Sequence, residues 1–257
     1  MIESLFKKGI YIVHAIRGYE RHGDRVKKLM GKQGLNFEFV SNADPELFSD
    51  ELLNKYFPSE FTNKHKKGTI SCTLNHIYAY ERIVKEQVPL AIVFEDDPFF
   101  LGEFKPKLLL LENEIKKLEP GFIISLENTT QRYPSFWDTK KGKHLYAAKT
   151  NRAAGAYILD LKTATILTDQ IKRNKCDEVI DWWQFRQSEK GLIKMYWAHP
   201  AMVEQGSING GLSAEISTRS SSSTRRLRWK IHKFYKMYFR RLLFVKMIIR
   251  LIVYFSG

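Results

Sequence analysis

The stretch 91–100, AIVFEDDPFF, decides the fold. Its first four residues are apolar and rich in β-branched side chains, so they predict a buried strand. Three consecutive carboxylates follow: Glu95, Asp96 and Asp97. The next residue, Pro98, is expected to stop regular strand pairing. Because an open α/β sheet binds its ligand outside the carboxyl ends of its strands, this pattern predicts a water-facing acidic site at the sheet edge.

Three adjacent carboxylates repel one another, and a divalent cation would relieve that repulsion. Hard oxygen ligands suit Mn²⁺ or Mg²⁺, which keep open positions for substrate phosphates. A solvated acidic turn after a core strand is an equal alternative, since acidic residues are common in turns. Spacing alone leaves both interpretations open.

Apolar periodicity alternates between strands and helices along the chain. Strands are expected at residues 9–15, 37–40, 90–95, 122–126, 153–159 and 195–199. Helices are expected at residues 23–33, 49–56, 69–86, 105–118, 162–172 and 179–189. This alternation predicts an α/β sheet flanked by helices.

Residues 67–100, KGTISCTLNHIYAYERIVKEQVPLAIVFEDDPFF, resemble the central signature of glycosyltransferase family 25, the lipooligosaccharide and lipopolysaccharide sugar transferases. The matching residues, in the family's order, are Gly68, Cys72, His76, Pro89 and the run from Val93 to Asp97. Residues 10–44, 151–167 and 199–208 resemble further elements of that family. The resemblance implies a GT-A type, Rossmann-like nucleotide-sugar fold.

The resemblance also implies roles for the acidic cluster. In a GT-A Asp-x-Asp pattern the first and third acidic positions matter most, and here these are Glu95 and Asp97. Asp97 is the expected direct metal ligand, and Asp96 or Glu95 is expected to act through water or the ribose of the donor. Removal of the Asp97 carboxylate is therefore expected to abolish transfer and leave the fold intact.

An inverting transfer needs a base that takes the proton of the acceptor hydroxyl. Family members carry an acidic residue in the region of NKCDEVIDWWQF, and Asp181 fits best. Asp177 and Glu178 are the alternatives. Acidic residues in the first turn of a helix also favour its dipole, which is the structural interpretation.

Three basic residues are candidates for the donor pocket. His76 carries the family match and is expected to order the nucleotide site. Arg17 and Arg21 follow the first strand, and a planar guanidinium suits phosphate or uracil contacts. A buried structural histidine and solvated surface arginines are the alternatives.

The two cysteines, Cys72 and Cys176, suggest neither a disulfide framework nor a metal-type spacing, and Cys72 is expected to be a small buried residue. The apolar run 10–16 is expected to form the first core strand and not a secretory signal. These features favour a reducing cytoplasm.

The sequence predicts a catalytic domain over residues 1–216, a Ser-rich linker over 217–224 and a basic amphipathic tail over 225–257. Eleven of the 42 basic residues and none of the 28 acidic ones lie between Thr218 and Gly257, so most of the net charge of +14 belongs to this segment.

The apolar residues of this tail recur at steps of three and four: Leu227, Ile231, Phe234, Tyr238, Leu242, Val245, Ile249 and Ile252. An interfacial helix on the anionic inner face of the cytoplasmic membrane is expected. A helix docked on the catalytic domain is the alternative, and nucleic-acid binding is not expected.

These observations predict a metal-dependent inverting glycosyltransferase. The resemblance implies that it moves a hexose, galactose before glucose, from a UDP-sugar to a lipid-linked lipopolysaccharide glycan. One alternative is a non-catalytic membrane-associated scaffold with a degenerate transferase fold, against which the intact acidic cluster argues. A metal-dependent nucleotide phosphodiesterase or nucleotidyltransferase is the other.

Overall fold

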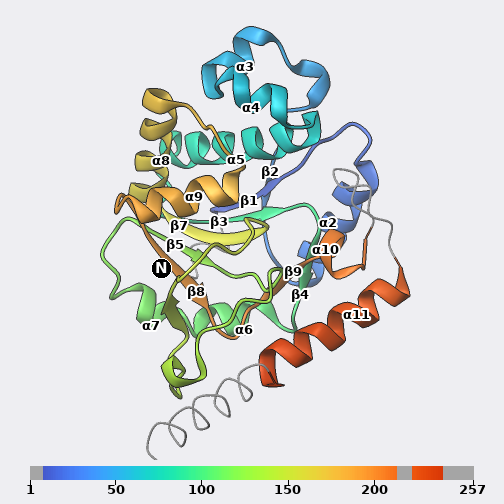
Figure 1. Ribbon diagram of the computed structural model, residues 1–257, viewed down its shortest axis with the longest axis vertical. Helices are drawn as coiled ribbons and strands as arrows, with labels where there is room; N and C mark the ends of the chain where they lie inside the picture. Colours follow the sequence, from blue (N-terminus) through green and yellow to red (C-terminus); the bar gives the residue numbers. More distant parts are fainter. Residues whose placement is uncertain (1–7, 213–221, 240–257) are drawn as a thin grey trace, which may run out of the picture.

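The computed structural model describes residues 8–212 and 222–239, which form a mixed sheet covered by helices on both faces (Figure 1). The seven strands lie in the order β2-β1-β3-β7-β5-β8-β6. Their bounds are β1 Ile10–Val13, β2 Glu38–Val40, β3 Leu90–Glu95, β5 Phe122–Ser125, β6 Leu145–Ala147, β7 Ala156–Asp160 and β8 Lys194–Ala198. Strands β7 and β6 run against the other five, so the sheet is mainly parallel. The predicted α/β sheet is confirmed.

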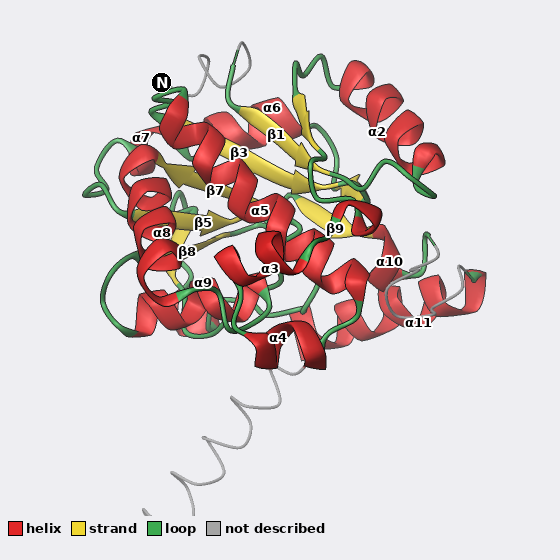
Figure 2. Ribbon diagram, turned by 90° about the horizontal axis from the view of Figure 1, so that it is seen from above, coloured by secondary structure: helices red, strands yellow, loops and turns green. Residues whose placement is uncertain are grey.

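Alternate side chains of the central strands enter two separate cores, because successive residues of a strand point to opposite faces. Tyr11 and Val93 pack under α5 and α8, whereas Ile12 and Phe94 pack against α2 and α6. Both faces of β3 are therefore buried, which explains its continuous apolar sequence. In the view turned by 90° α5 lies across the sheet (Figure 2).

The helices that cover the sheet match most of the predicted ones. Their bounds are α2 Glu20–Lys32, α3 Asp50–Tyr56, α4 Ser59–Lys64, α5 Lys67–Lys85, α6 Phe104–Leu109, α7 Glu112–Ile115, α8 Leu161–Asn174, α9 Ile180–Glu189, α10 Gly206–Asn209 and α11 Ser223–Phe234. The single helix predicted over 105–118 is wrong, since the chain forms the two short helices α6 and α7 there. The strand predicted from 153 begins at Ala156.

Pairing does not stop at Pro98, contrary to the prediction. This residue opens a second, two-stranded sheet, in which β4, Pro98–Phe100, runs antiparallel to β9, Val203–Gln205. A proline can occupy the first residue of a strand because its missing N–H is not required there. The turn at Asp96 and Asp97 thus lies between two sheets and is largely enclosed.

The helix α11 docks on the rest of the protein through polar side chains. The buried carboxylate of Glu204 on β9 accepts two hydrogen bonds from this helix. One comes from Nε1 of Trp229 at 3.2 Å, and the other from Nζ of Lys233 at 2.5 Å. The Arg225 guanidinium donates to the carbonyl of Ser207 at 3.0 Å. This polar contact leaves the apolar side of the helix facing outward.

The outward side of α11 carries three of the predicted apolar stripe residues, each more than half exposed: Leu227, Ile231 and Phe234. The helix begins at Ser223, where the hydroxyl of Ser222 accepts a hydrogen bond from the backbone N–H of Arg225. The remaining predicted tail, residues 240–257, lies outside the described residues. Within the described ranges, no helix is both long enough and apolar enough to cross a bilayer.

Candidate active site

Glu95 ends β3 and meets side chains from α5 and β9. Its Oε2 accepts a hydrogen bond of 2.7 Å from Nε2 of Gln205, and its Oε1 lies 3.7 Å from Nε2 of His76. Burial raises the pKa of the Glu95 carboxyl well above its usual range, the charges of Asp97 and Asp96 raise it further, and the Gln205 hydrogen bond lowers it. Bringing a cation to this carboxylate would offset both the burial and the repulsion.

His76 is fully buried on α5, and its two ring nitrogens have different surroundings. Nδ1 lies 2.8 Å from the hydroxyl of Tyr157, and that hydroxyl donates to the hydroxyl of Tyr80 at 3.1 Å. In the tautomer in which Nδ1 donates to this hydroxyl, the lone pair of Nε2 faces Glu95, and Nε2 is buried without a hydrogen-bond partner. Burial lowers the pKa of His76 to about 3, so its imidazole is neutral at physiological pH.

Cys72 completes a group of three possible metal ligands with His76 and Glu95. One ligand atom of each side chain lies within 4.8 Å of the other two. Cys72 and His76 are four residues apart, a spacing that puts both on one face of α5. That spacing was the available sequence signal, so the prediction that Cys72 has no metal-type partner spacing is wrong.

Asp96 is held by two histidines. Its Oδ2 lies 2.6 Å from Nδ1 of His14, at the end of β1, and its Oδ1 lies 3.6 Å from Nδ1 of His22 on α2. Burial raises the pKa of Asp96, but the contacts with His14 and His22 outweigh burial and leave the pKa below its usual value. This carboxylate is ionised and its oxygens face imidazoles.

Asp97 is only 4% exposed, which contradicts the expectation that the whole cluster faces water. Its Oδ2 accepts the backbone N–H of Ser207 at 2.8 Å, and its backbone carbonyl accepts that of Gly206. Its Oδ1 is buried without a hydrogen-bond partner. Burial raises the pKa of Asp97, and the Ser207 hydrogen bonds oppose that rise. One oxygen of Asp97 thus holds the β9–α10 turn.

Two small cavities meet at Cys72 and Glu95, which line both. The first, of about 80 Å³, lies at the ends of β1 and β3 and is also lined by Tyr19, Gly68 and Asp96. The second, of about 200 Å³, is also lined by Ala153, Gln205 and Asp181. Glu95 is therefore positioned between two chambers on opposite sides of the α5 helix start.

Asp181, the predicted base, lies in the first turn of α9 and lines the second cavity. Its Oδ1 accepts the backbone N–H of Trp182 at 2.9 Å. Burial raises the pKa of Asp181, while hydrogen bonds from Asn151 and Trp182 lower it by less. The two alternative candidates for the base, Asp177 and Glu178, form ion pairs with Arg186 on the surface.

Arg17 and Arg21 lie away from these cavities. The Arg17 guanidinium is exposed and pairs with Glu46, and Arg21 lines a separate surface cavity along α2 together with Arg25 and Lys28. Neither arginine lines the chamber that Asp96 and Tyr19 share. The structure brings together five of the predicted site residues: His76, Glu95, Asp96, Asp97 and Asp181.

Two residues that the sequence analysis did not select lie beside Glu95. Gln205 of β9 donates to it directly. Glu127 is fully buried after β5, and a side chain at Gly155 would come within 2.0 Å of its Oε1 and 2.5 Å of Nε2 of Gln205. A glycine is required at 155 because these two polar side chains occupy the space of its missing Cβ.

Comparisons with known proteins identify the family. The sequence profile of glycosyltransferase family 25 (LPS biosynthesis protein) matches residues 8–181. The lipooligosaccharide biosynthesis protein lic2B of Haemophilus influenzae is 27% identical over 121 residues, which cover 46% of this chain and 44% of that protein. Procollagen galactosyltransferase 2 of Mus musculus is 24% identical over 118 residues, covering 43% of this chain and 19% of that protein. The chain therefore matches less than half the length of either relative.

Among solved structures, mouse xyloside xylosyltransferase 1 covers 76% of this chain and 68% of its own, with a TM-score of 0.30 and 14% identity. The inositol-1-phosphate CTP transferase from T. maritima has a TM-score of 0.34 and 13% identity, and the match covers 76% of this chain and 67% of that one. The family match and the mainly parallel sheet give the chain a GT-A-like fold. The profile covers well over half of the residues, and the chain belongs to glycosyltransferase family 25, the family of LPS biosynthesis proteins.

Proposed function

We propose that this chain transfers a hexose, with galactose favoured over glucose, from a UDP-sugar to a lipooligosaccharide or lipopolysaccharide glycan, with inversion. The observation that carries the proposal is the position of Glu95 between two chambers, with Asp181 in one and Asp96 in the other. Such a site offers separate places for donor and acceptor. The similarity to mouse procollagen galactosyltransferase 2 supports galactose.

The first chamber is the proposed donor side, because it lies at the carboxyl ends of β1 and β3, where open α/β sheets bind nucleotides. At about 80 Å³ it accommodates only part of a nucleotide sugar. Donor binding would therefore displace the loop 14–19 between β1 and α2. The predicted contact of Arg17 with the donor would also require this loop to move, and that of Arg21 would require the start of α2 to move with it.

A divalent cation fits the residues at Glu95. The unpartnered, fully buried Nε2 of His76 points at Glu95, and Cys72 offers a third ligand atom. We propose Mn²⁺ over Mg²⁺, because Mg²⁺ takes oxygen ligands whereas imidazole suits transition metals. When bound, the cation supplies positive charge for the leaving diphosphate. Asp97 stays the alternative ligand through its unpartnered Oδ1.

Asp181 is the proposed base. Its raised pKa brings the carboxylate closer to the working pH of a proton acceptor, and its cavity adjoins Glu95. The acceptor hydroxyl would lie in this second chamber, lose its proton to Asp181 and attack the anomeric carbon from the side opposite the diphosphate. The C1–oxygen bond to UDP breaks as the new glycosidic bond forms.

We also propose that α11 rests on an anionic membrane surface on the cytoplasmic side. Its polar side is used to dock on Glu204, and the exposed apolar side chains of Leu227, Ile231 and Phe234 face away. An enzyme that acts on a membrane-embedded lipid gains local acceptor concentration by binding that membrane.

The proposed transfer is tested by measuring the release of UDP from a panel of UDP-sugars. Each sugar is assayed with Mn²⁺, Mg²⁺, Zn²⁺ or EDTA, and with or without truncated lipopolysaccharide as acceptor. We expect UDP from one sugar, only with metal and acceptor together. Glu95→Gln should remove this activity, whereas Glu103→Gln, a charge-matched change outside the site, should not. UDP-sugar hydrolysis that ignores the acceptor, or release of pyrophosphate, would contradict the proposal.

A further inference from the structure

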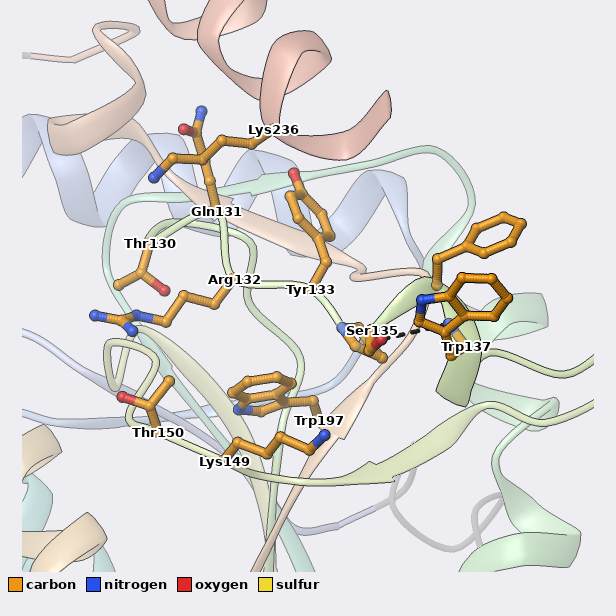
Figure 3. A pocket seen from close by; sticks show the side chains of 12 residues that line it. Thr130, Gln131, Arg132, Tyr133, Ser135, Trp137, Lys149, Thr150, Trp197 and Lys236 are labelled. Carbon is orange, nitrogen blue, oxygen red and sulfur yellow. Dashed lines mark hydrogen bonds between the residues drawn. The ribbon is translucent and has the colours of Figure 1, made fainter. Parts of the chain in front are cut away.

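A separate groove of about 640 Å³ lies between the loop 130–137, the loop 149–150, β8 and the segment that follows α11. In Figure 3, Lys236 and Gln131 lie on one side of it, Trp197 and Lys149 on the other, and Trp137 at one end. Nε2 of Gln131 donates to the carbonyl of Trp229 at 3.3 Å, which joins the loop to α11. The groove is thus built from parts of the chain that are distant in sequence.

The aromatic side chains of the groove are suited to the apolar faces of sugar rings. Phe136 and Trp137 are 57% and 63% exposed, which is costly for such large apolar groups unless a ligand covers them. Trp197 is nearly buried, and the Arg152 guanidinium lies 4.6 Å from its ring centroid. Arg152 is itself fixed by the carbonyls of Glu127 and Ala198. Trp197 is therefore a fixed part of the groove wall, and the exposed rings of Phe136 and Trp137 are the ones available to stack on a sugar.

The charge of the groove has one sign. Arg132, Lys149 and Lys236 line it, and no acidic side chain is among its lining residues in the described ranges. Lys149 pairs with Asp138 at 2.8 Å, and its side chain is still 70% exposed. Cations beside aromatic rings favour a ligand that is both a saccharide and an anion.

Two loops connect the groove to the second chamber of the active site. Lys149 and Thr150 line the groove, the next residue Asn151 hydrogen-bonds Asp181, and Ala153 lines the chamber. On the other side Thr130 lines the groove, and the adjacent Thr129 accepts the backbone N–H of Gln205 at 3.2 Å. A chain of sugars could therefore continue from Asp181 into the groove.

We infer that this groove binds the portion of the acceptor glycan next to the sugar that receives the hexose, and that it selects glycans carrying a phosphate or carboxylate group. The inference rests on the proposed transferase function and adds the location and charge of the acceptor subsite. Lys236 couples the groove to α11, so an acceptor held at a membrane by its lipid would enter beside the helix proposed to rest there.

Three probes of equal length test the groove: a neutral hexose tetrasaccharide, the same tetrasaccharide with one phosphate monoester, and the same with one uronic acid. Binding to the full chain is measured by calorimetry without donor, and KM for each is measured with donor. We expect the phosphate or the uronic acid probe to bind at least 10-fold more tightly than the neutral one, since a charge-assisted contact contributes about 1.5 kcal/mol or more.

The double variant Arg132→Gln, Lys149→Gln should reduce this preference to near unity, and Trp137→Ala should weaken binding of all three probes. The controls are Lys172→Gln, at an exposed lysine, and Leu110→Ala, at a 54% exposed leucine, both outside the groove. They should leave the preference for the anionic probes unchanged. Equal binding of the three probes, or a preference that survives the double variant, would overturn the inference. Anion-selective binding without any sugar transfer would retain the groove and reject the proposed function instead.

Discussion

Nε2 of His76 lies 3.7 Å from Oε1 of Glu95, and no hydrogen bond joins them. The hydroxyl of Tyr157 lies 2.8 Å from the far nitrogen, Nδ1, and because it donates to Tyr80 it favours the tautomer with the proton on Nδ1. A neutral imidazole with its lone pair aimed at a carboxylate is unfavourable by itself. The same arrangement is favourable when a cation lies between the two groups, as in metal sites where an acceptor behind the ligand histidine orients its ring.

Tyr157→Phe tests the orientation of this imidazole. The variant removes the acceptor that holds the Nδ1 proton, so we expect the apparent metal affinity in activity titrations to fall about 10–100-fold. The free energy of unfolding should fall by about 1 kcal/mol, because a buried hydrogen bond to Tyr80 is also lost. Tyr146→Phe is the control, since its hydroxyl bonds only the 140–143 turn. An unchanged metal dependence would show that Tyr157 does not position His76.

Glu95 and Asp97 should respond differently to substitution. Glu95→Gln keeps the shape of a side chain that is partly exposed, so kcat should fall about 10³-fold or more while Tm stays within a few degrees of the wild type. Asp97→Ala leaves the backbone N–H of Ser207 without its acceptor, so it should also lower the free energy of unfolding by about 1–3 kcal/mol. Thermal melts and initial rates separate the two effects. A Glu95→Gln enzyme with wild-type kcat would reject the role of Glu95.

The strand 90–95 was predictable because its apolar run and its acidic end are both local features of the sequence. The enclosure of Asp97 was not, because it depends on β9, about a hundred residues later, pairing with β4. The same long-range pairing brings Gln205 to Glu95. The grouping of Cys72 with His76 and Glu95 depends on a helix face that Cys72 and His76 share, which their spacing of four residues could have indicated.

Glu127 should make stability depend on pH. Burial raises the pKa of its carboxyl well above its usual range, and the charge of Glu95 raises it further. The folded state therefore holds this proton more tightly than the unfolded state, so the contribution to stability is present at low pH and is lost as the pH rises above about 4.3, the unfolded value. Glu127→Gln keeps the shape without the ionisation and should raise Tm at pH 8 by about 2–4 °C for each kcal/mol recovered.

Thermal melts of wild type and Glu127→Gln between pH 5 and pH 9 measure this difference. The difference in Tm should shrink steadily as the pH falls toward 5, because the cost of holding the proton on folded Glu127 falls as the pH approaches the unfolded value of about 4.3. A difference that is constant across the range would mean that the variant acts through packing and not through the proton. Glu119→Gln, at an exposed carboxylate paired with Lys194, is the matched control.

Gly155→Ala should damage the support of Glu95 without touching it. The added Cβ would lie 2.5 Å from Nε2 of Gln205, the atom that donates to Glu95, so Gln205 must move. We expect a loss of about 1–3 kcal/mol in the free energy of unfolding from overpacking, together with a lower kcat. Gly31→Ala, in the interior of α2 with no atom within 4 Å of the added Cβ, should be neutral or stabilising by up to about 1 kcal/mol. Equal stability and activity of the two variants would contradict the crowding at Gly155.

Membrane binding by α11 is tested better by substitution than by truncation. Cutting at Ser220 would also remove Trp229 and Lys233 from the buried Glu204, so the loss of binding could reflect damage to the domain. The triple change Leu227→Ser, Ile231→Ser, Phe234→Ser alters only the exposed side of the helix.

We expect the triple variant to co-sediment with vesicles of anionic lipid at least 10-fold less than the wild type, because each apolar side chain transferred from water contributes about 1–2 kcal/mol. The wild type should also be released partly when the salt is raised from 0.1 to 0.5 M, since the basic residues act through screened attraction. The double change Leu109→Ser, Leu110→Ser, which removes exposed leucines elsewhere, is the control. Equal vesicle binding by the triple variant and the wild type would mean that the exposed face of α11 is not the membrane contact.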